Sequence, residues 1–411
     1  MSDRRGINTA DINQPVRDFS AAAFQQDTMR PMNQKPLKFV FISYVTPGVS
    51  VPPKGWGAAE SLVWDYKTYL EKLGHTAVII HTGNQQGLIE KVNAHRPDVV
   101  HSHWKHSMKV MRKINAPVKL LTAHSGWGAE SALRAFNFHL KHLFQYITDG
   151  WSWFALSPAW KKTLLEFGYH PAEVFVAPNG ADHRRYRFRK TPLHADRSLY
   201  LGRVQARKRQ ALYQTVDGLD FAGPLSGETS KFDASRANYL GEWTREHLYE
   251  HLSDYANLVM LSESEAAAPM VVLEALVCGL GVVVSAGATD NLDTRLPWIT
   301  VIPEEKIADV DFVAVEIARN REIALRHREQ IREYGIDNFS WDRLVPRYAD
   351  LCRKLHDEKI ARQGLFARAA DSCRRIPRAL PALGHFTVRD FLSAFCPDWI
   401  RRLVRPPPPQ K

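Results

Sequence analysis

Short apolar runs alternate with amphipathic segments along the chain between residues 38 and 356. The first run, "KFVFISY", predicts a β-strand, and the segment after "PPKGWG" places Leu62, Tyr66 and Leu70 on one face of a helix. This alternation is typical of parallel sheets whose strands are joined by crossover helices. The pattern therefore predicts an α/β fold.

A break in composition divides this alternation into two halves. The basic stretch "ADHRRYRFRKTPLHADR" interrupts the apolar pattern, which restarts with "SLYLGRV". We therefore predict two doubly wound, Rossmann-like parallel-sheet domains with an interdomain cleft, because such sheets bind ligands beyond the carboxyl ends of their strands. The predicted organisation is a disordered leader (1–36), an N-terminal domain (37–185), a linker (186–197), a C-terminal domain (198–340), a closing helix (341–358) and a basic amphipathic tail (359–411).

The composition is that of an ordinary soluble globular protein, with 45% apolar and 24% charged residues. No apolar run is long enough to span a bilayer, and the leader lacks the apolar core of a secretion signal. The four cysteines include no Cys-x-x-Cys pair, which argues against a disulfide framework or a zinc cluster and fits a reducing compartment. These features predict a cytoplasmic protein.

The net charge of +11 is concentrated near the C-terminus. Residues 353–411 contain thirteen Lys or Arg and five Asp or Glu, a net charge of +8, so the remainder carries only +3. Such a tail favours an anionic partner, which is a membrane, a nucleic acid or a polyanionic glycan. Apolar residues recur among arginines in "HFTVRDFLSAFCPDWIRRLVR", so we predict that residues 360–411 contact an anionic membrane surface. The alternative is that these side chains pack on the protein's own body.

Two cations, Arg203 and Lys208, follow a predicted strand in "LGRVQARKRQ". A helix is expected just beyond them, and the start of a helix favours anions rather than cations. The arrangement is explained if an anion such as a diphosphate binds there. The alternative is a solvated basic turn.

Two further segments are candidates for ligand contacts. Glu274 lies within a short apolar helix, "PMVVLEALVCG", where a buried carboxylate needs partners that the hydroxyls of a ribose can supply. An exposed helix position is the alternative. In the loop "PPKGWGAAE", Gly55 and Gly57 allow a ligand to approach the backbone at a helix start, although such loops are also ordinary turns.

Histidines follow two neighbouring predicted strands, in "VVHSHW" and "TAHSGW", and include His103 and His124. Histidines at strand ends that face a cleft hydrogen-bond a substrate or serve a structural role. A zinc site is the less favoured alternative, since no cysteine or carboxylate cluster accompanies them.

Taken together and in this order, the motifs resemble those of the retaining glycosyltransferases of family 4, which have the GT-B fold of two Rossmann-like domains. The resemblance covers about residues 38–354. "PPKGWGAAE" is similar to the family's Pro-Pro…Tyr-Gly-Gly-x-Glu loop, and "DVVHSHW" and "LLTAHSG" are similar to its histidine-containing strand ends. "VAPNGAD", "LGRVQARK" and "FSWDRLVPRYADL" are similar to its Pro-Asn-Gly-Val-Asp segment, its Gly-Arg…Lys site and its closing Phe-Ser-Trp helix.

The resemblance implies a role for each matching residue. Arg203 and Lys208 would hold the donor diphosphate and, with His124 beside the donor sugar, form the catalytic set. Glu274 would bind the nucleotide ribose. No metal is implied, because cations and helix ends neutralise the leaving diphosphate. The remaining implied contacts are donor-binding Gly57, Ala58 (where a second glycine is usual), Glu265, Met270 and Val271, and acceptor-binding Glu60, His103 and Trp127.

One part of the family pattern is displaced in this sequence. The family has two glutamates separated by seven residues, and the first contacts the donor sugar, but counting back from Glu274 reaches Ala266. Glu265 is one position away and Glu263 is three positions away. Either a one-residue bulge brings Glu265 into the site, or the sugar contact is absent.

The implied function is the transfer of a sugar, with retention, from a UDP- or GDP-sugar to a glycan or lipid-linked acceptor. A hexose is the expected sugar, and no cofactor is expected because the nucleotide sugar is a substrate. The tail would hold the enzyme at the inner face of the membrane. The alternatives are a glycosyltransferase acting on modified nucleic-acid bases, a non-transferase such as a nucleotide-sugar epimerase, and an inactive protein with the GT-B fold.

Overall fold

The structure is a computed structural model, and it describes residues 35–43, 46–103, 111–122, 124, 150–226, 231–263, 265 and 267–358. The predicted leader, apart from residues 35 and 36, lies outside these ranges, as does the whole of the predicted tail (359–411).

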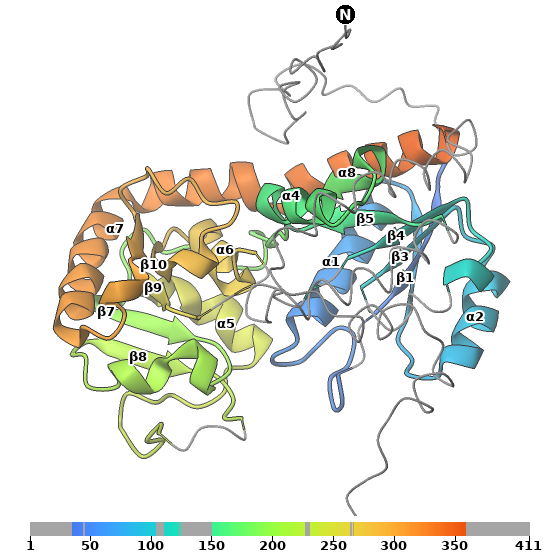
Figure 1. Cartoon of the computed structure of the whole chain (residues 1–411). Helices are drawn as coiled ribbons and strands as arrows, with labels where there is room; N and C mark the ends of the chain where they lie inside the picture. The colour runs from blue at the N-terminus through green and yellow to red at the C-terminus, as the bar shows by residue number, and fades with distance from the viewer. Residues whose placement is uncertain are drawn as a thin grey trace, which may run out of the picture. The chain divides into compact units, whose positions relative to one another are not determined.

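The first lobe is built on a parallel sheet whose described strands have the order β2-β1-β3-β4-β5-β6 (Figure 1). Its central strands are almost wholly buried because helices cover the sheet, and most of their residues are apolar. The strands are β1 (Lys38–Ile42), β2 (Thr76–Ile80), β3 (Val99–Ser102), β4 (Val118–Leu121), β5 (Ser152–Ala155) and β6 (Val174–Val176), and the helices within this part of the chain are α1 (Ala58–Lys72), α2 (Gln85–Ala94) and α4 (Pro158–Glu166).

The second lobe has a parallel sheet whose described strands have the order β11-β10-β9-β7-β8. The predicted fold class, with two parallel α/β sheets, is therefore confirmed. The strands are β7 (His194–Leu201), β8 (Leu219–Ala222), β9 (Tyr255–Met260), β10 (Gly281–Ser285) and β11 (Ile299–Ile302), and the helices are α5 (Arg245–His251), α6 (Met270–Val277) and α7 (Val310–Phe339).

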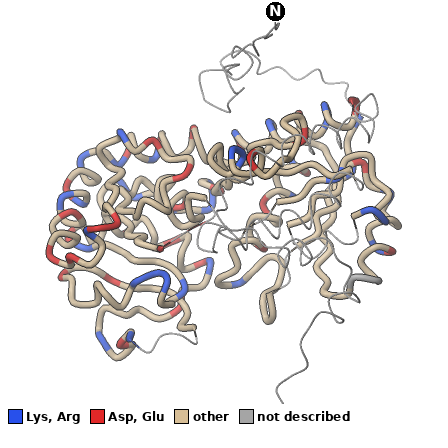
Figure 2. The backbone as a smooth tube through the Cα atoms, viewed as in Figure 1, with Lys and Arg blue, Asp and Glu red and all other residues tan. Residues whose placement is uncertain are grey.

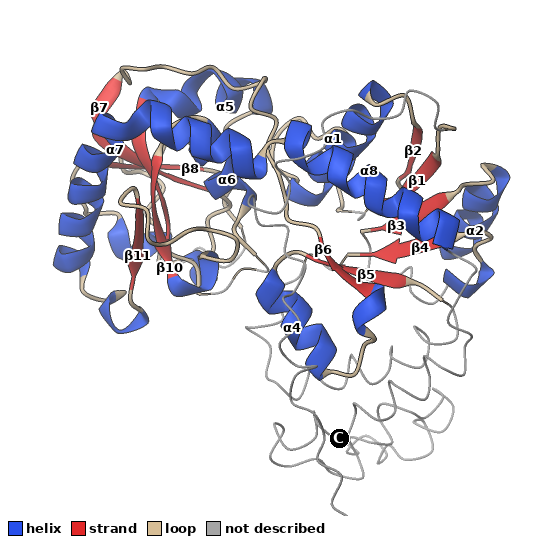
Figure 3. Ribbon diagram, turned by 90° about the horizontal axis from the view of Figure 1, so that it is seen from above, coloured by secondary structure: helices blue, strands red, loops and turns tan. Residues whose placement is uncertain are grey.

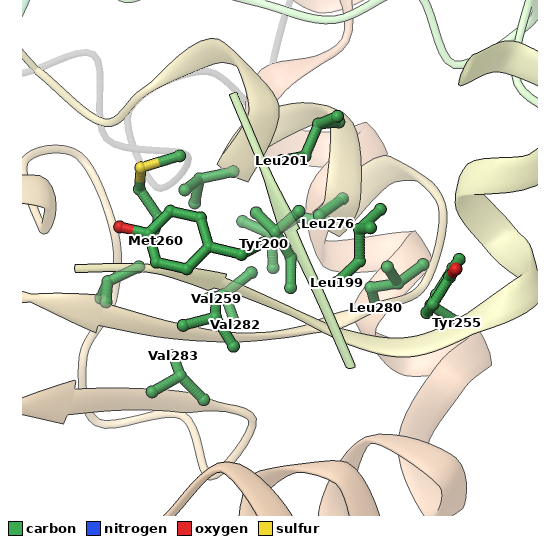
Figure 4. Packing of buried hydrophobic residues seen from close by; sticks show 14 of the residues in the cluster. Leu199, Tyr200, Leu201, Tyr255, Val259, Met260, Leu276, Leu280, Val282 and Val283 are labelled. Atoms are coloured by element: carbon green, nitrogen blue, oxygen red, sulfur yellow. The ribbon is translucent and has the colours of Figure 1, made fainter. Parts of the chain in front are cut away.

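The core of the second lobe brings neighbouring strands together and also positions a loop. Leu199, Val259 and Val282 belong to one buried apolar cluster around the sheet (Figure 4). Tyr200 belongs to the same cluster, and its hydroxyl donates a hydrogen bond to the carbonyl of Lys208 and accepts one from the backbone N–H of Leu261 at 2.9 Å. The loop after β7 is therefore held against the end of β9.

The last described helix, α8 (Trp341–Glu358), returns to the first lobe. Its apolar face, which includes Trp341, Val345 and Tyr348, belongs to the same buried cluster as Phe39 and Tyr66. The Trp341 indole N–H also donates to Asp65 of α1 at 3.0 Å. Figure 3 shows α8 lying across the first sheet beside α1.

Two details of the predicted organisation differ from the structure. Strand β7 begins at His194, so the predicted linker (186–197) is shorter by its last four residues. No α-helix follows Arg203: the chain forms two 3₁₀ turns, Ala206–Lys208 and Gln210–Tyr213. They are separated by Arg209, whose left-handed backbone (φ 57°) interrupts helical continuation.

Among the described residues, none of the helices is both long enough and apolar enough to cross a membrane. Acidic and basic side chains are interspersed along the described backbone (Figure 2).

Candidate functional site

A pocket of about 550 Å³ lies between segments of the two lobes, beside the carboxyl ends of β3, β7, β8 and β9. Its volume is in the usual range for a small-molecule site. Trp127 lies outside the described residues. All the other predicted site residues line the pocket: Gly57, Ala58, Glu60, His103, His124, Arg203, Lys208, Glu265, Met270, Val271 and Glu274.

Lys208 and Glu265 form a buried ion pair in the pocket wall. Lys208 Nζ donates to Glu265 Oε1 at 3.1 Å, and Ser262 Oγ donates to the same oxygen at 2.7 Å. Burial raises the pKa of the Glu265 carboxyl, but Lys208, Ser262 and Arg207 together lower it below its ordinary value. Burial, with the neighbouring Arg207 and Arg203, lowers the pKa of the Lys208 ammonium below its ordinary value, although Glu265 opposes this. A second anion in the pocket would therefore stabilise the charged lysine further.

The two glutamates near the displaced position lie in different environments. The Glu265 side chain is 15% exposed and lines the pocket. The Glu263 side chain is 54% exposed, lies 3.9 Å from the Arg209 guanidinium and does not line the pocket. Ala266 lies outside the described residues. Of these two glutamates, the structure thus places Glu265, and not Glu263, in the pocket wall.

Arg203 lines the pocket with its guanidinium stacked on an aromatic ring. Its Cζ atom lies 3.9 Å from the centre of the Trp56 ring, and within the described part of the chain it forms no ion pair. Trp56 belongs to the glycine-rich loop (residues 53–57) of the first lobe and was not among the predicted site residues. The family motif has a tyrosine at this position, which is a signal that points to Trp56 from sequence.

Glu274 is only 3% exposed, which excludes the alternative of an exposed helix glutamate. Its Oε1 accepts a hydrogen bond from Arg245 Nη1 at 2.8 Å, and Arg245 Nη2 donates to Ser61 Oγ at 2.6 Å. Arg245 lines the pocket as well. It was missed in the sequence because the helix "TREHLYEH" carries no recognisable motif, and its partners are distant along the chain.

Helices α1 and α6 both begin at the pocket and offer backbone N–H groups. Gly57 precedes α1 with φ 136°, and a Cβ there would lie 2.8 Å from Val49 Cγ1, so a side chain is excluded. Helix α6 begins at Met270 after Pro269, and the N–H groups of Met270 and Val271 have no acceptor among the described residues. These N–H groups can hydrogen-bond an anionic ligand.

Three histidines lie together at the ends of β3 and β4. His103 Nδ1 and His124 Nε2 share a 2.8 Å hydrogen bond. His101 is held on both ring nitrogens, by Tyr348 at 3.1 Å and Thr122 at 2.9 Å, and is therefore structural. Burial lowers the pKa of His124 to about 4, and it lowers the pKa of His101 and His103 well below the ordinary value. All three rings are therefore neutral near pH 7.

Some buried polar atoms of the pocket residues lack partners in the described part of the chain. Three of them belong to residues of the first lobe, which was predicted to bind an acceptor: Glu60 Oε1, His103 Nε2 and Asn179 Oδ1. Buried polar atoms are rarely left without a hydrogen bond, so a ligand hydroxyl is a natural partner. Among the described residues, including these histidines, no group of three His, Cys, Asp or Glu side chains is placed so that it could hold a metal ion.

Comparisons with known proteins bear on the fold and the family. The family model described as Glycosyltransferase Family 4 matches residues 72–185. No curated protein sequence matches the chain. Similar solved structures include AviGT4, a glycosyltransferase involved in avilamycin A biosynthesis (20% identity, TM-score 0.58, covering 78% of this chain and 98% of that one). Anabaena Alr3699/HepE in complex with UDP and glucose (16%, 0.57, 78% and 100%) and the lipopolysaccharide outer core galactosyltransferase WaaB (14%, 0.54, 77% and 99%) are also similar. At these identities the likeness shows the fold, which is GT-B.

Proposed function

We propose that the chain is a glycosyltransferase of family 4, whose family model matches residues 72–185, and that it transfers a hexose, with retention, from a UDP- or GDP-sugar to a glycan or lipid-linked acceptor. The proposal rests on the observation that one pocket is lined by the Lys208–Glu265 pair, the stacked Arg203 and the buried Glu274. Cations suit a diphosphate, and a buried carboxylate suits the hydroxyls of a ribose. The UDP bound to Alr3699/HepE makes a uridine donor the first to test.

In the proposed reaction the donor diphosphate lies against Arg203 and Lys208. Negative charge grows on the diphosphate as the bond to the sugar breaks, so these cations stabilise the transition state more than the bound substrate. The N–H groups at the start of α6, which have no acceptor among the described residues, add to the same effect. The acceptor hydroxyl attacks from the face that the diphosphate leaves, and its proton passes to a phosphate oxygen.

The acceptor binds on the side of the first lobe. We assign Glu60 and His103 to it because their buried polar atoms, Oε1 and Nε2, have no described partner. His124 would hydrogen-bond the donor sugar as a neutral ring, since burial lowers its pKa to about 4. Residues 360–411 would hold the enzyme on an anionic membrane near a lipid-linked acceptor, a proposal supported by their basic and apolar composition.

A donor screen tests the function directly. Thermal shifts with UDP-, GDP- and other nucleotide sugars select a donor, and proton NMR of the product then reports whether the anomeric configuration is retained. Arg203→Ala and Lys208→Ala are expected to lower turnover at least about tenfold, because each loses a charge-assisted contact to the diphosphate. Arg209→Ala is the matched control, since Arg209 lies in the same basic run but pairs with Glu304 outside the pocket. Wild-type turnover in both pocket variants would contradict the assignment.

A further inference from the structure

Arg245 joins the two lobes at the point where the ribose is proposed to bind. It is the first residue of α5, and its side chain is largely buried. Through Nη1 it holds Glu274 Oε1 of the second lobe, and through Nη2 it holds Ser61 Oγ on α1 of the first lobe. Its backbone N–H donates to the carbonyl of Lys54 at 3.0 Å, within the glycine-rich loop.

The guanidinium places a positive charge beside Glu274 and holds one of its carboxyl oxygens, Oε1, at 2.8 Å. The acceptor sites that remain on the carboxyl group can take hydrogen bonds from the hydroxyls of a ribose. Burial lowers the pKa of Arg245, but Glu274, Tyr186 and Tyr249 raise it above its ordinary value, so the arginine stays charged.

The remaining contacts of Arg245 reach the phosphate side of the pocket. Ser61 lies in the first turns of α1, and Lys54 lies two residues before Trp56, which stacks on Arg203. The residues that are proposed to bind the ribose and the diphosphate are therefore connected through one segment of the first lobe, residues 54–61. Glu274 lies on α6 and Arg203 lies on the loop after β7, and the contacts of Arg245 provide one route between them.

We propose that Arg245 is a positioning residue of the donor site, which fixes Glu274 for recognition of the ribose and couples nucleoside binding to the glycine-rich loop. This inference rests on the proposed function. It assigns to one arginine both the discrimination between ribose and deoxyribose and the placement of the loop beside the diphosphate.

Calorimetry with UDP, GDP, dUDP and dGDP tests the first part. The wild type is expected to bind the ribonucleotide it prefers about tenfold or more tightly than its 2′-deoxy counterpart, the loss of one hydrogen bond to a charged group. Arg245→Ala is expected to bind both forms equally, at the affinity of the deoxy form. Arg245→Lys keeps a charge but cannot reach Glu274 and Ser61 together, so it should retain only part of the preference.

Ser61→Ala tests the coupling separately, because it leaves the contact between Arg245 and Glu274 intact. The preference for ribose is expected to persist in this variant, while kcat falls about three- to tenfold with the KM for the donor unchanged. Thermal unfolding of each unliganded variant checks that it folds. If Arg245→Ala does not fold, the comparison is made with Arg245→Lys.

Two results would overturn the inference, and they differ from failure of the proposed function. If Arg245→Ala keeps the wild-type preference for ribose, or if it weakens ribonucleotides and deoxynucleotides by the same factor, Arg245 has only a structural role. If Ser61→Ala leaves kcat unchanged, the coupling to the loop is wrong. If the wild type binds neither UDP nor GDP, the proposed function is wrong, and the inference about Arg245 is then wrong as well.

Discussion

Replacing Glu265 by glutamine separates two roles that the structure gives to one carboxylate. The side chain holds Lys208 at 3.1 Å, and it also lines the pocket where the donor sugar is proposed to lie. Glutamine keeps the size and one oxygen, so Ser262 can still donate to it, but the negative charge is lost. Without donor the variant therefore contains a buried lysine with no carboxylate partner.

The size of the effect follows from the burial of the pair. Breaking a buried ion pair costs about 3–5 kcal/mol, and because the two side chains are 11% and 15% exposed we expect the lower end, about 3 kcal/mol. A bound diphosphate supplies negative charge beside Lys208 and should restore most of this loss. UDP or GDP is therefore expected to raise the melting temperature of Glu265→Gln by more than it raises that of the wild type.

Turnover of Glu265→Gln should fall, even though UDP or GDP stabilises this variant more than the wild type. If Glu265 also contacts the donor sugar, the variant loses a hydrogen bond to a charged group, and kcat falls about 10- to 150-fold. Initial rates at saturating donor measure this, and Glu263→Gln is the matched control because that side chain is exposed outside the pocket. Equal and mild losses in the two variants would show that neither carboxylate touches the sugar.

Three other predictions concern Trp56, Asp65 and the predicted tail. Trp56→Ala should weaken UDP or GDP binding about two- to fivefold, because the stacked Arg203 loses a cation–π contact, whereas Trp56→Phe should retain most of the affinity in calorimetry; no change in the alanine variant would refute this. Burial raises the pKa of Asp65 to about 6 although Arg185 opposes it, so the folded state keeps a proton that the unfolded state releases near pH 4. Stability should therefore fall as pH rises from about 4 to 6, and in thermal unfolding Asp65→Asn should lack that decrease; an unchanged slope would contradict it. Truncation after residue 358 should release the protein from anionic vesicles in a flotation assay and leave donor binding intact, and loss of donor binding would mean that the tail is part of the folded body.

The local spacing of apolar and polar residues was enough to predict most of the fold and part of the site. The apolar runs of β1 and β9 and the spaced apolar face of α1 are periodic, and periodicity follows from burial on sheet faces and helix stripes. The helix expected after Arg203 was wrong, because the left-handed Arg209 divides the segment into two turns. A single residue with positive φ that is not glycine leaves no trace in the sequence pattern.

Contacts between distant segments were the part that the sequence did not predict. Arg245 and Ser61 are 184 positions apart, and no local rule connects them. The position of Glu265 was left between two alternatives, because the geometry of a loop decides which of two neighbouring side chains faces a pocket.

The return of α8 to the first lobe has a consequence for how the chain folds during synthesis. Trp341, Val345 and Tyr348 fill the same buried cluster as Phe39 and Tyr66, so that cluster is incomplete until the ribosome has made the end of the described chain. At about 5–20 residues per second, the segment between the two parts takes on the order of ten seconds or more to synthesise. During that interval the nascent first lobe exposes the apolar surface that α8 later covers. The second lobe, whose core draws on β7–β11 and α5–α7, is complete before the first, so the order in which the lobes finish folding is the reverse of their order in the sequence.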